Sequence, residues 1–174
     1  MIGALRRFAD QFMGRGDAAI TVPPFDGALK PNQLLEEAKI FATLDAPEDM
    51  ATDGTSVFIA DGPRVLRYAG TAGTEAARFD RTVTALASLP DGGLAVALDG
   101  REVRIAGGKH DGRSWTAVDG RPLLAANAIA ATGDGRLLVT DGSATQPYER
   151  WCHDLMELGR SGRLLSFDAP SGEA

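Results

Sequence analysis

Few side chains in this sequence are suited to nucleophilic or zinc chemistry. It holds two histidines, His110 and His153, in different segments, and one cysteine, Cys152. It has no Gly-x-Ser-x-Gly motif to place a serine nucleophile on a sharp turn, and no Cys/His spacing of a zinc site. These observations argue against a Ser-His-Asp hydrolase and a zinc enzyme. Cys152 beside His153 leaves a thiol function open, but we expect both to be buried on a helix.

Many of the remaining oxygen-bearing side chains belong to Asp-Gly pairs. Asp53, Asp91 and Asp134 each precede a glycine between two apolar runs, which is a strong hairpin signal, so turn formation is the expected role of these carboxylates. The pairs recur about every 40 residues, a period typical of a repeat architecture. The repeat has three copies, namely Glu48–Tyr68, Thr84–Ile105, and Asn127–Gly142 with its continuation Gly162–Asp168.

Each copy has the same order of elements. A short apolar segment leads to an Asp-Gly turn, a central apolar strand, a second Asp-Gly turn and an alternating strand that begins with arginine. The central strands VFIA, LAVA and LLVT are apolar enough to be buried on both faces. Short strands at this period are typical of β-propeller blades.

The predicted fold is therefore all-β. We expect three four-stranded blades of a β-propeller, at about residues 45–70, 80–106 and 123–170 of a partial-propeller domain spanning 41–174. Residues 1–40 are predicted to form a lead-in that starts with a short amphipathic helix near Met1–Met13.

The third copy contains an insertion, Ser143–Ser161, with a predicted helix over Arg150–Leu158. Trp151, Leu155 and Leu158 share one side of that helix, and Gly159 ends it. Two roles stay open for the helix. It could shield one end of the propeller, or it could form the wall of a pocket.

The repeat alignment singles out one position in each copy. Matching Met50, Leu86 and Ile129 places Glu48, Thr84 and Asn127 at equivalent points, where the innermost strand of each blade begins and faces the central channel.

Asp141 and Ser143 are further candidates, with Thr84, for the mouth of the channel. Each candidate also has a purely structural interpretation. These are a solvated strand acid for Glu48, a strand threonine for Thr84, a turn residue for Asn127, and hairpin residues for Asp141 and Ser143.

The third copy resembles the strictosidine synthase-like proteins. The resemblance runs through Leu137–Thr140, Asp141-Gly142-Ser143, the helical insert and Ser161–Leu165, and the lead-in Val22–Ala38 is similar as well. That family groups with the gluconolactonase and senescence-marker proteins, which are six-bladed propellers. The resemblance implies that this chain corresponds to the first three blades.

The resemblance also implies a chemistry. Active members of the superfamily hold a calcium ion in the channel through a Glu of the first blade and Asn and Asp residues of later ones. Glu48 and Asn127 stand at two of these positions, and both have oxygen atoms of the kind that calcium prefers. The expected activity is calcium-dependent hydrolysis of a lactone or ester, with no catalytic residue assigned. Alkaloid condensation is not expected, because its glutamate lies in a later blade.

The amino-acid composition excludes some classes of binding partner. With 18 Lys and Arg against 24 Asp and Glu, the net charge of −6 argues against nucleic acid as a partner, and no apolar run is long enough to span a membrane. No secretory signal is recognisable, which favours the cytoplasm. The expected partners are a small-molecule substrate and whatever closes the ring.

Three blades leave two open faces, since a closed propeller needs at least four. The chain is thus an incomplete product, a split half that needs a C-terminal half, or a protomer that closes by association. A non-catalytic propeller that binds small molecules or proteins is the alternative to the hydrolase.

Overall fold

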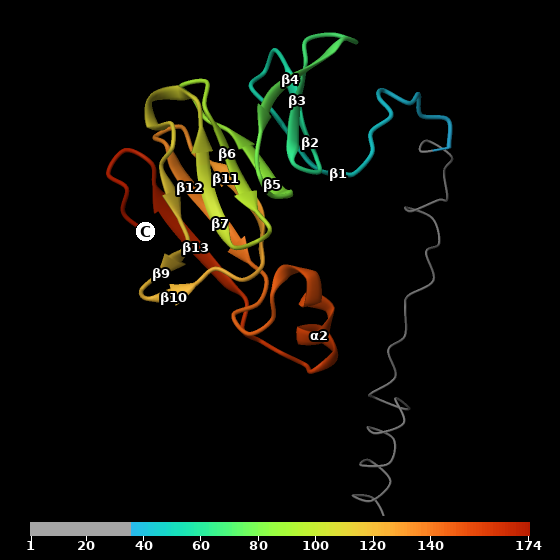
Figure 1. Cartoon of the computed structure of the whole chain (residues 1–174). Helices are drawn as coiled ribbons and strands as arrows, with labels where there is room; N and C mark the ends of the chain where they lie inside the picture. The colour runs from blue at the N-terminus through green and yellow to red at the C-terminus, as the bar shows by residue number, and fades with distance from the viewer. Residues whose placement is uncertain (1–35) are drawn as a thin grey trace, which may run out of the picture. The chain divides into compact units, whose positions relative to one another are not determined.

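The computed structural model describes residues 36–174, and Phe41–Ala174 form one compact unit. The helix predicted near Met1–Met13 lies outside the described residues. The unit is built from consecutive antiparallel sheets, in each of which the strands follow chain order (Figure 1). This confirms the all-β propeller class. None of the helices in the described part of the chain is long and apolar enough to cross a membrane.

The first sheet and the second sheet each have four strands. The first consists of β1 (Pro47–Thr52), β2 (Val57–Asp61), β3 (Arg64–Tyr68) and β4 (Gly73–Arg78). The second consists of β5 (Val83–Ser88), β6 (Leu94–Leu98), β7 (Glu102–Ala106) and β8 (Ser114–Trp115). The fourth strands β4 and β8 lie beyond the predicted blade ranges, because β4 is almost wholly exposed and β8 has only two residues, so neither carries an apolar run.

The third sheet has three strands within residues 36–174. They are β11 (Ala126–Ala131), β12 (Arg136–Asp141) and β13 (Arg163–Asp168). A small two-stranded ribbon, β9 (Ala117–Val118) and β10 (Arg121–Pro122), precedes this sheet, and the 3₁₀ turn η2 (Gly108–His110) follows β7. Between β12 and β13 the chain forms the 3₁₀ turn η3 (Tyr148–Arg150) and the helix α2 (Trp151–Met156), so the predicted insert helix is present but shorter.

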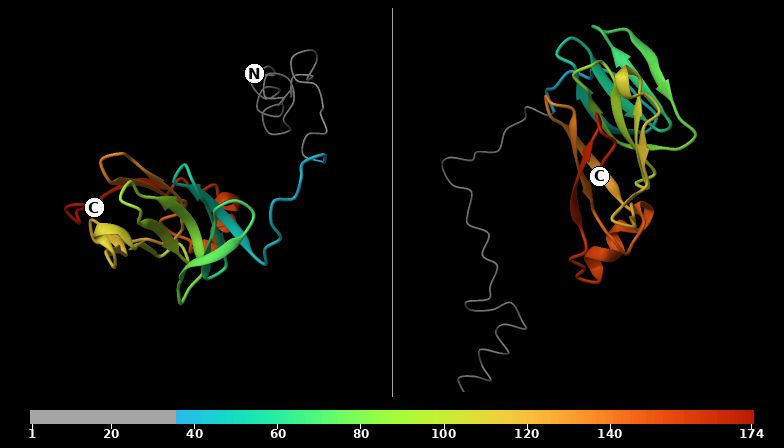
Figure 2. Two further views of the ribbon diagram at one scale, coloured as in Figure 1. Left: turned by 90° about the horizontal axis from the view of Figure 1, so that it is seen from above. Right: turned by 90° about the vertical axis from the view of Figure 1, so that its left-hand side faces the viewer.

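The second sheet lies between the other two, and its innermost strand β5 contacts both β1 and β11 (Figure 2). Successive side chains of β6 point to opposite faces, and a neighbouring sheet covers each face, so the strand is buried along its whole length. Leu94, Val96 and Leu98 pack with the first sheet, whereas Ala95 and Ala97 pack with the third. The prediction that LAVA is buried on both faces is therefore confirmed.

The same prediction is wrong for LLVT in β12. Leu137 and Val139 are buried against the second sheet, but Leu138 is 37% exposed and Thr140 is exposed as well. The physical reason is that the third sheet is covered on one face only within the described residues.

The turns depend on glycine in two different ways. Asp99 and Gly100, between β6 and β7, both have positive φ (48° and 67°), as the predicted type I′ turn requires. In the turn after β1, only Gly54 is left-handed (φ 89°). There Asp53 accepts hydrogen bonds from the backbone and hydroxyl of Thr55 and from the Ser56 backbone, led by the Thr55 hydroxyl, and these bonds lower its pKa to about 2. The turn role of this carboxylate is thereby explained.

Candidate functional site

A pocket lies where the three innermost strands begin. Its volume is about 420 Å³, and Glu48 in the bulge of β1, Thr84 of β5 and Asn127 of β11 all line it. Strand pairing and the β1–β5–β11 contacts bring these residues together from positions about 40 residues apart in the chain. The equivalence predicted from the repeat therefore corresponds to one site in space.

The three side chains differ in solvent exposure and in their hydrogen bonds to the rest of the fold. Thr84 is buried, and its hydroxyl donates to the Ala126 carbonyl (3.0 Å) and accepts from the Gly100 amide (3.2 Å). It thus joins the second sheet to the third, which supports the structural interpretation of Thr84. Glu48 and Asn127 are both exposed and can meet a ligand.

Each of these two exposed side chains accepts one hydrogen bond. The Tyr148 hydroxyl donates to Glu48 Oε2 (3.3 Å), and the Thr140 hydroxyl donates to Asn127 Oδ1 (2.8 Å). Burial of Tyr148, and next the negative charge of Glu48, raise the pKa of the phenol. Tyr148 is therefore a neutral donor that holds the Glu48 carboxylate at the pocket.

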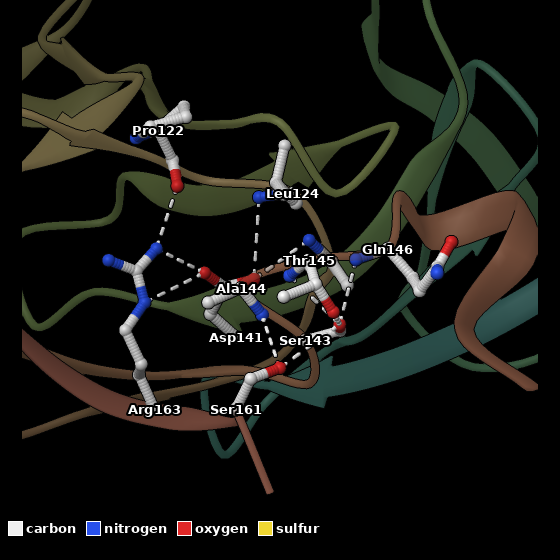
Figure 3. A network of polar contacts seen from close by, with 10 residues as sticks. Pro122, Leu124, Asp141, Ser143, Ala144, Thr145, Gln146, Ser161 and Arg163 are labelled. Carbon is white, nitrogen blue, oxygen red and sulfur yellow. Dashed lines mark hydrogen bonds and ion pairs between the residues drawn. The ribbon is translucent and has the colours of Figure 1, made fainter. Parts of the chain in front are cut away.

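Asp141 does not line the pocket but supports the segment behind it. Its side chain is fully buried and accepts the backbone amides of Ala125 (2.7 Å) and Leu124 (3.4 Å). It also forms an ion pair with Arg163 (2.5 Å), which donates in addition to the Pro122 carbonyl (Figure 3). With all these contacts inside the fold, Asp141 ties β10–β11 to the end of β12.

Ser143 is likewise buried outside the pocket. Its hydroxyl accepts the amides of Thr145 (3.2 Å) and Gln146 (2.9 Å), which fixes the start of the insert (Figure 3). The same hydroxyl donates to Asp154 Oδ1 (3.1 Å). Ser143 thus positions the insert, and with it the pocket wall.

The insert forms that wall. Tyr148 of η3 and Trp151, Asp154 and Leu155 of α2 all line the pocket. The insert helix therefore lines the pocket, as the predicted role of pocket wall requires. Trp151 and Leu155 remain more than half exposed, so together they give the pocket one apolar, open side.

Cys152 is exposed on α2, so its predicted burial is wrong. The helix has only six residues and buries only Asp154. His153 is half-buried, and its Nδ1 accepts from Arg150 Nε (3.1 Å).

Asp154 is a pocket residue that the sequence analysis missed. It is only 6% exposed, and its Oδ1 accepts the hydroxyls of Ser143, Thr145 and Ser161 at 3.0–3.1 Å. Within the described residues these side-chain bonds all end on Oδ1, although the residue reaches the pocket. One signal was available. Asp154 lies on the same side of the predicted helix as Trp151, Leu155 and Leu158, and a carboxylate on an apolar helix face indicates a hydrogen-bonded or functional role.

The pocket is acidic. Glu48 and Asp154 supply two carboxylates, and within residues 36–174 no Lys, Arg or His lines the cavity. The same described residues contain no cluster of three or more His, Cys, Asp and Glu side chains placed to hold a metal. As a set of calcium donors, the chain offers the Glu48 carboxylate and the Asn127 amide oxygen, whereas calcium takes six to eight oxygens. The donors are of the right kind, and they make up part of a site.

The consecutive sheets with adjacent innermost strands define the chain as part of a β-propeller. No protein-family model matches the chain, and no curated protein does. A similar solved structure is a protein of Thermus thermophilus provisionally described as an oxidoreductase (glucose dehydrogenase), with 20% identity and a TM-score of 0.45. The match covers 75% of this chain and 45% of the other, so the chain spans less than half the length of that protein. The strictosidine synthase-like resemblance remains a prediction.

Proposed function

We propose that the pocket binds a small lactone or ester together with calcium and that the propeller hydrolyses it. The observation that carries the proposal is that Glu48 and Asn127, from different sheets, line one cavity of about 420 Å³. This volume falls in the range of small-molecule sites.

Several residues that line the pocket have a role in the proposed reaction. Glu48 and Asn127 would hold the ion, and the remaining oxygens would come from the substrate, from water and from outside the described residues. When bound, calcium would act as a Lewis acid on the substrate carbonyl. Tyr148 orients Glu48, while Trp151 and Leu155 offer an apolar surface to the substrate.

The first test measures calcium binding by isothermal titration calorimetry. Glu48→Gln keeps the shape of the side chain and removes its charge, so it should weaken calcium binding by more than about tenfold. Glu149→Gln is the matched control, because Glu149 is exposed, pairs with Arg101 (3.0 Å) and does not line the pocket. Equal calcium binding by the wild type and Glu48→Gln would remove Glu48 from the site and contradict the proposal.

Hydrolysis is tested separately on a panel of lactones and aryl esters. The rate should require calcium and should fall in Glu48→Gln but not in Glu149→Gln. Activity that persists unchanged after chelation of calcium would also contradict the proposal.

One observation favours a second candidate, a non-catalytic binding propeller. Glu48 and Asn127 already accept hydrogen bonds from Tyr148 and Thr140, and the described residues hold no larger metal-ligand cluster. This alternative predicts that small molecules bind the pocket without calcium and are released unchanged. Mass analysis of the ligand after incubation separates the two candidates.

A further inference from the structure

Within residues 36–174, the two outer sheets each present a face that is only partly covered. On the first sheet this face includes Met50, which pairs with Ile59 across β1 and β2 and is 70% exposed. On the third sheet it includes Thr140 and Leu164, which pair across β12 and β13, and Leu164 is also 70% exposed. We call these the first open face and the third open face.

The strand register identifies the residues of the first and second sheets that are equivalent to those on the third open face. The pair Thr140–Leu164 occupies the place of Ala97–Val103 in the second sheet and of Ala60–Val65 in the first. All four of those earlier residues are fully buried, because each pair faces the next sheet along the chain. The third sheet thus presents a face that the fold covers twice elsewhere.

The first open face corresponds to the other side of these sheet junctions, the side that packs against the preceding sheet. Met50 occupies the place of Leu86 and Ile129 in the repeat. Leu86 is buried in the core between the first and second sheets, and Ile129 packs against the core between the second and third. The residue at this position is therefore the one that a sheet turns toward its predecessor. Phe41 packs on Tyr68 (5.2 Å between ring centroids) and leaves Met50 exposed.

We propose that a second copy of this chain covers both open faces. The first open face of each copy would pack on the third open face of the other, in the same way as the two sheet junctions within the chain. Two such head-to-tail contacts close a ring of six sheets, which lies within the range of four to eight blades known for closed propellers. A second copy is the occupant because the chain carries both halves of a junction that it already forms twice.

Closure would also change the pocket. It would place a second Glu48, Thr84 and Asn127 around the same channel and cover part of its open side. The association itself rests on the fold and not on the proposed function. Its test measures mass, so it can fail or succeed whatever the pocket binds.

The experiment is sedimentation velocity, with native mass spectrometry, on the full chain at micromolar concentration. The wild type should have twice the chain mass of 18.3 kDa. Met50→Glu and Leu164→Glu should each be monomeric, with dimer affinity lowered by more than about a hundredfold, because each substitution places a charge in both apolar contacts of the ring. Met156→Glu, at a residue of α2 that is 79% exposed, is the matched control and should remain dimeric.

An equimolar mixture of the two monomeric variants tests the head-to-tail arrangement. One unmodified first face and one unmodified third face remain in the mixture, so a heterodimer with a single contact should form. Circular dichroism of each variant checks the fold, which should be unchanged because both side chains are exposed. A monomeric wild type, open filaments, or a dimer that survives either substitution would overturn the proposal.

Discussion

Removal of the Asp141 carboxylate should destabilise the fold strongly. Asp141→Ala leaves the Arg163 guanidinium, whose side chain is 15% exposed, without its buried carboxylate, and it leaves the amides of Leu124 and Ala125 without their acceptor. Breaking a buried ion pair from one side costs about 3–5 kcal/mol. Arg163 keeps its bond to the Pro122 carbonyl, so we expect about 3 kcal/mol, a large share of a typical stability.

The assay is urea unfolding at fixed protein concentration, followed by tryptophan fluorescence, because Trp115 is buried in the core. Asp80→Ala is the matched control. Asp80 is exposed and lies 3.7 Å from Arg81, so its loss should cost less than about 1 kcal/mol. The double variant Asp141→Ala with Arg163→Met should recover part of the loss, since no charge is left buried. If Asp141→Ala costs no more than Asp80→Ala, the supporting role assigned to Asp141 is refuted.

Two further predictions concern other parts of the fold. The Ala46 amide and the Arg64 ion pair hold the pKa of Asp61 below its usual value, so its contribution to stability is complete above the unfolded pKa of about 3.9 and is lost as the pH falls through the lower folded value. Urea midpoints measured from neutral to acid pH should therefore decline, less steeply in Asp61→Asn, and equal slopes would contradict this. Gly159→Ala should cost about 1–3 kcal/mol, because a Cβ there would lie 2.4 Å from Asp154 Cγ. Thermal unfolding measures this loss of stability, and an unchanged melting temperature would show that the insert accommodates the added Cβ without cost.

Much of the architecture could be predicted from local pattern. Alternation and Asp-Gly turns are properties of neighbouring residues, so β6 and the Asp99-Gly100 turn were predictable. Strand β4 was not, because all but one of its side chains are exposed and its pairing with β3 provides the order. The burial of β12 was wrongly predicted for a related reason: an apolar strand does not reveal whether a second sheet covers it.

The candidate site was predictable where it follows the repeat. Glu48, Thr84 and Asn127 are equivalent in the sequence, and they line one pocket. Asp154 was not predictable to the same degree, since its burial depends on hydroxyls contributed by Ser143 and Ser161 on both sides of the insert.

The sequence alone determined the repeat, the antiparallel sheets and the type of residue at the start of each innermost strand, because strand alternation and turn chemistry act over a few residues. Only the tertiary structure decided which of those residues remain free for a ligand. The Thr84 hydroxyl joins two sheets, whereas Glu48 and Asn127 remain exposed and line the pocket. That choice depends on the packing of sheets distant in the chain, because burial and hydrogen-bond partners are set by contacts that no short segment contains.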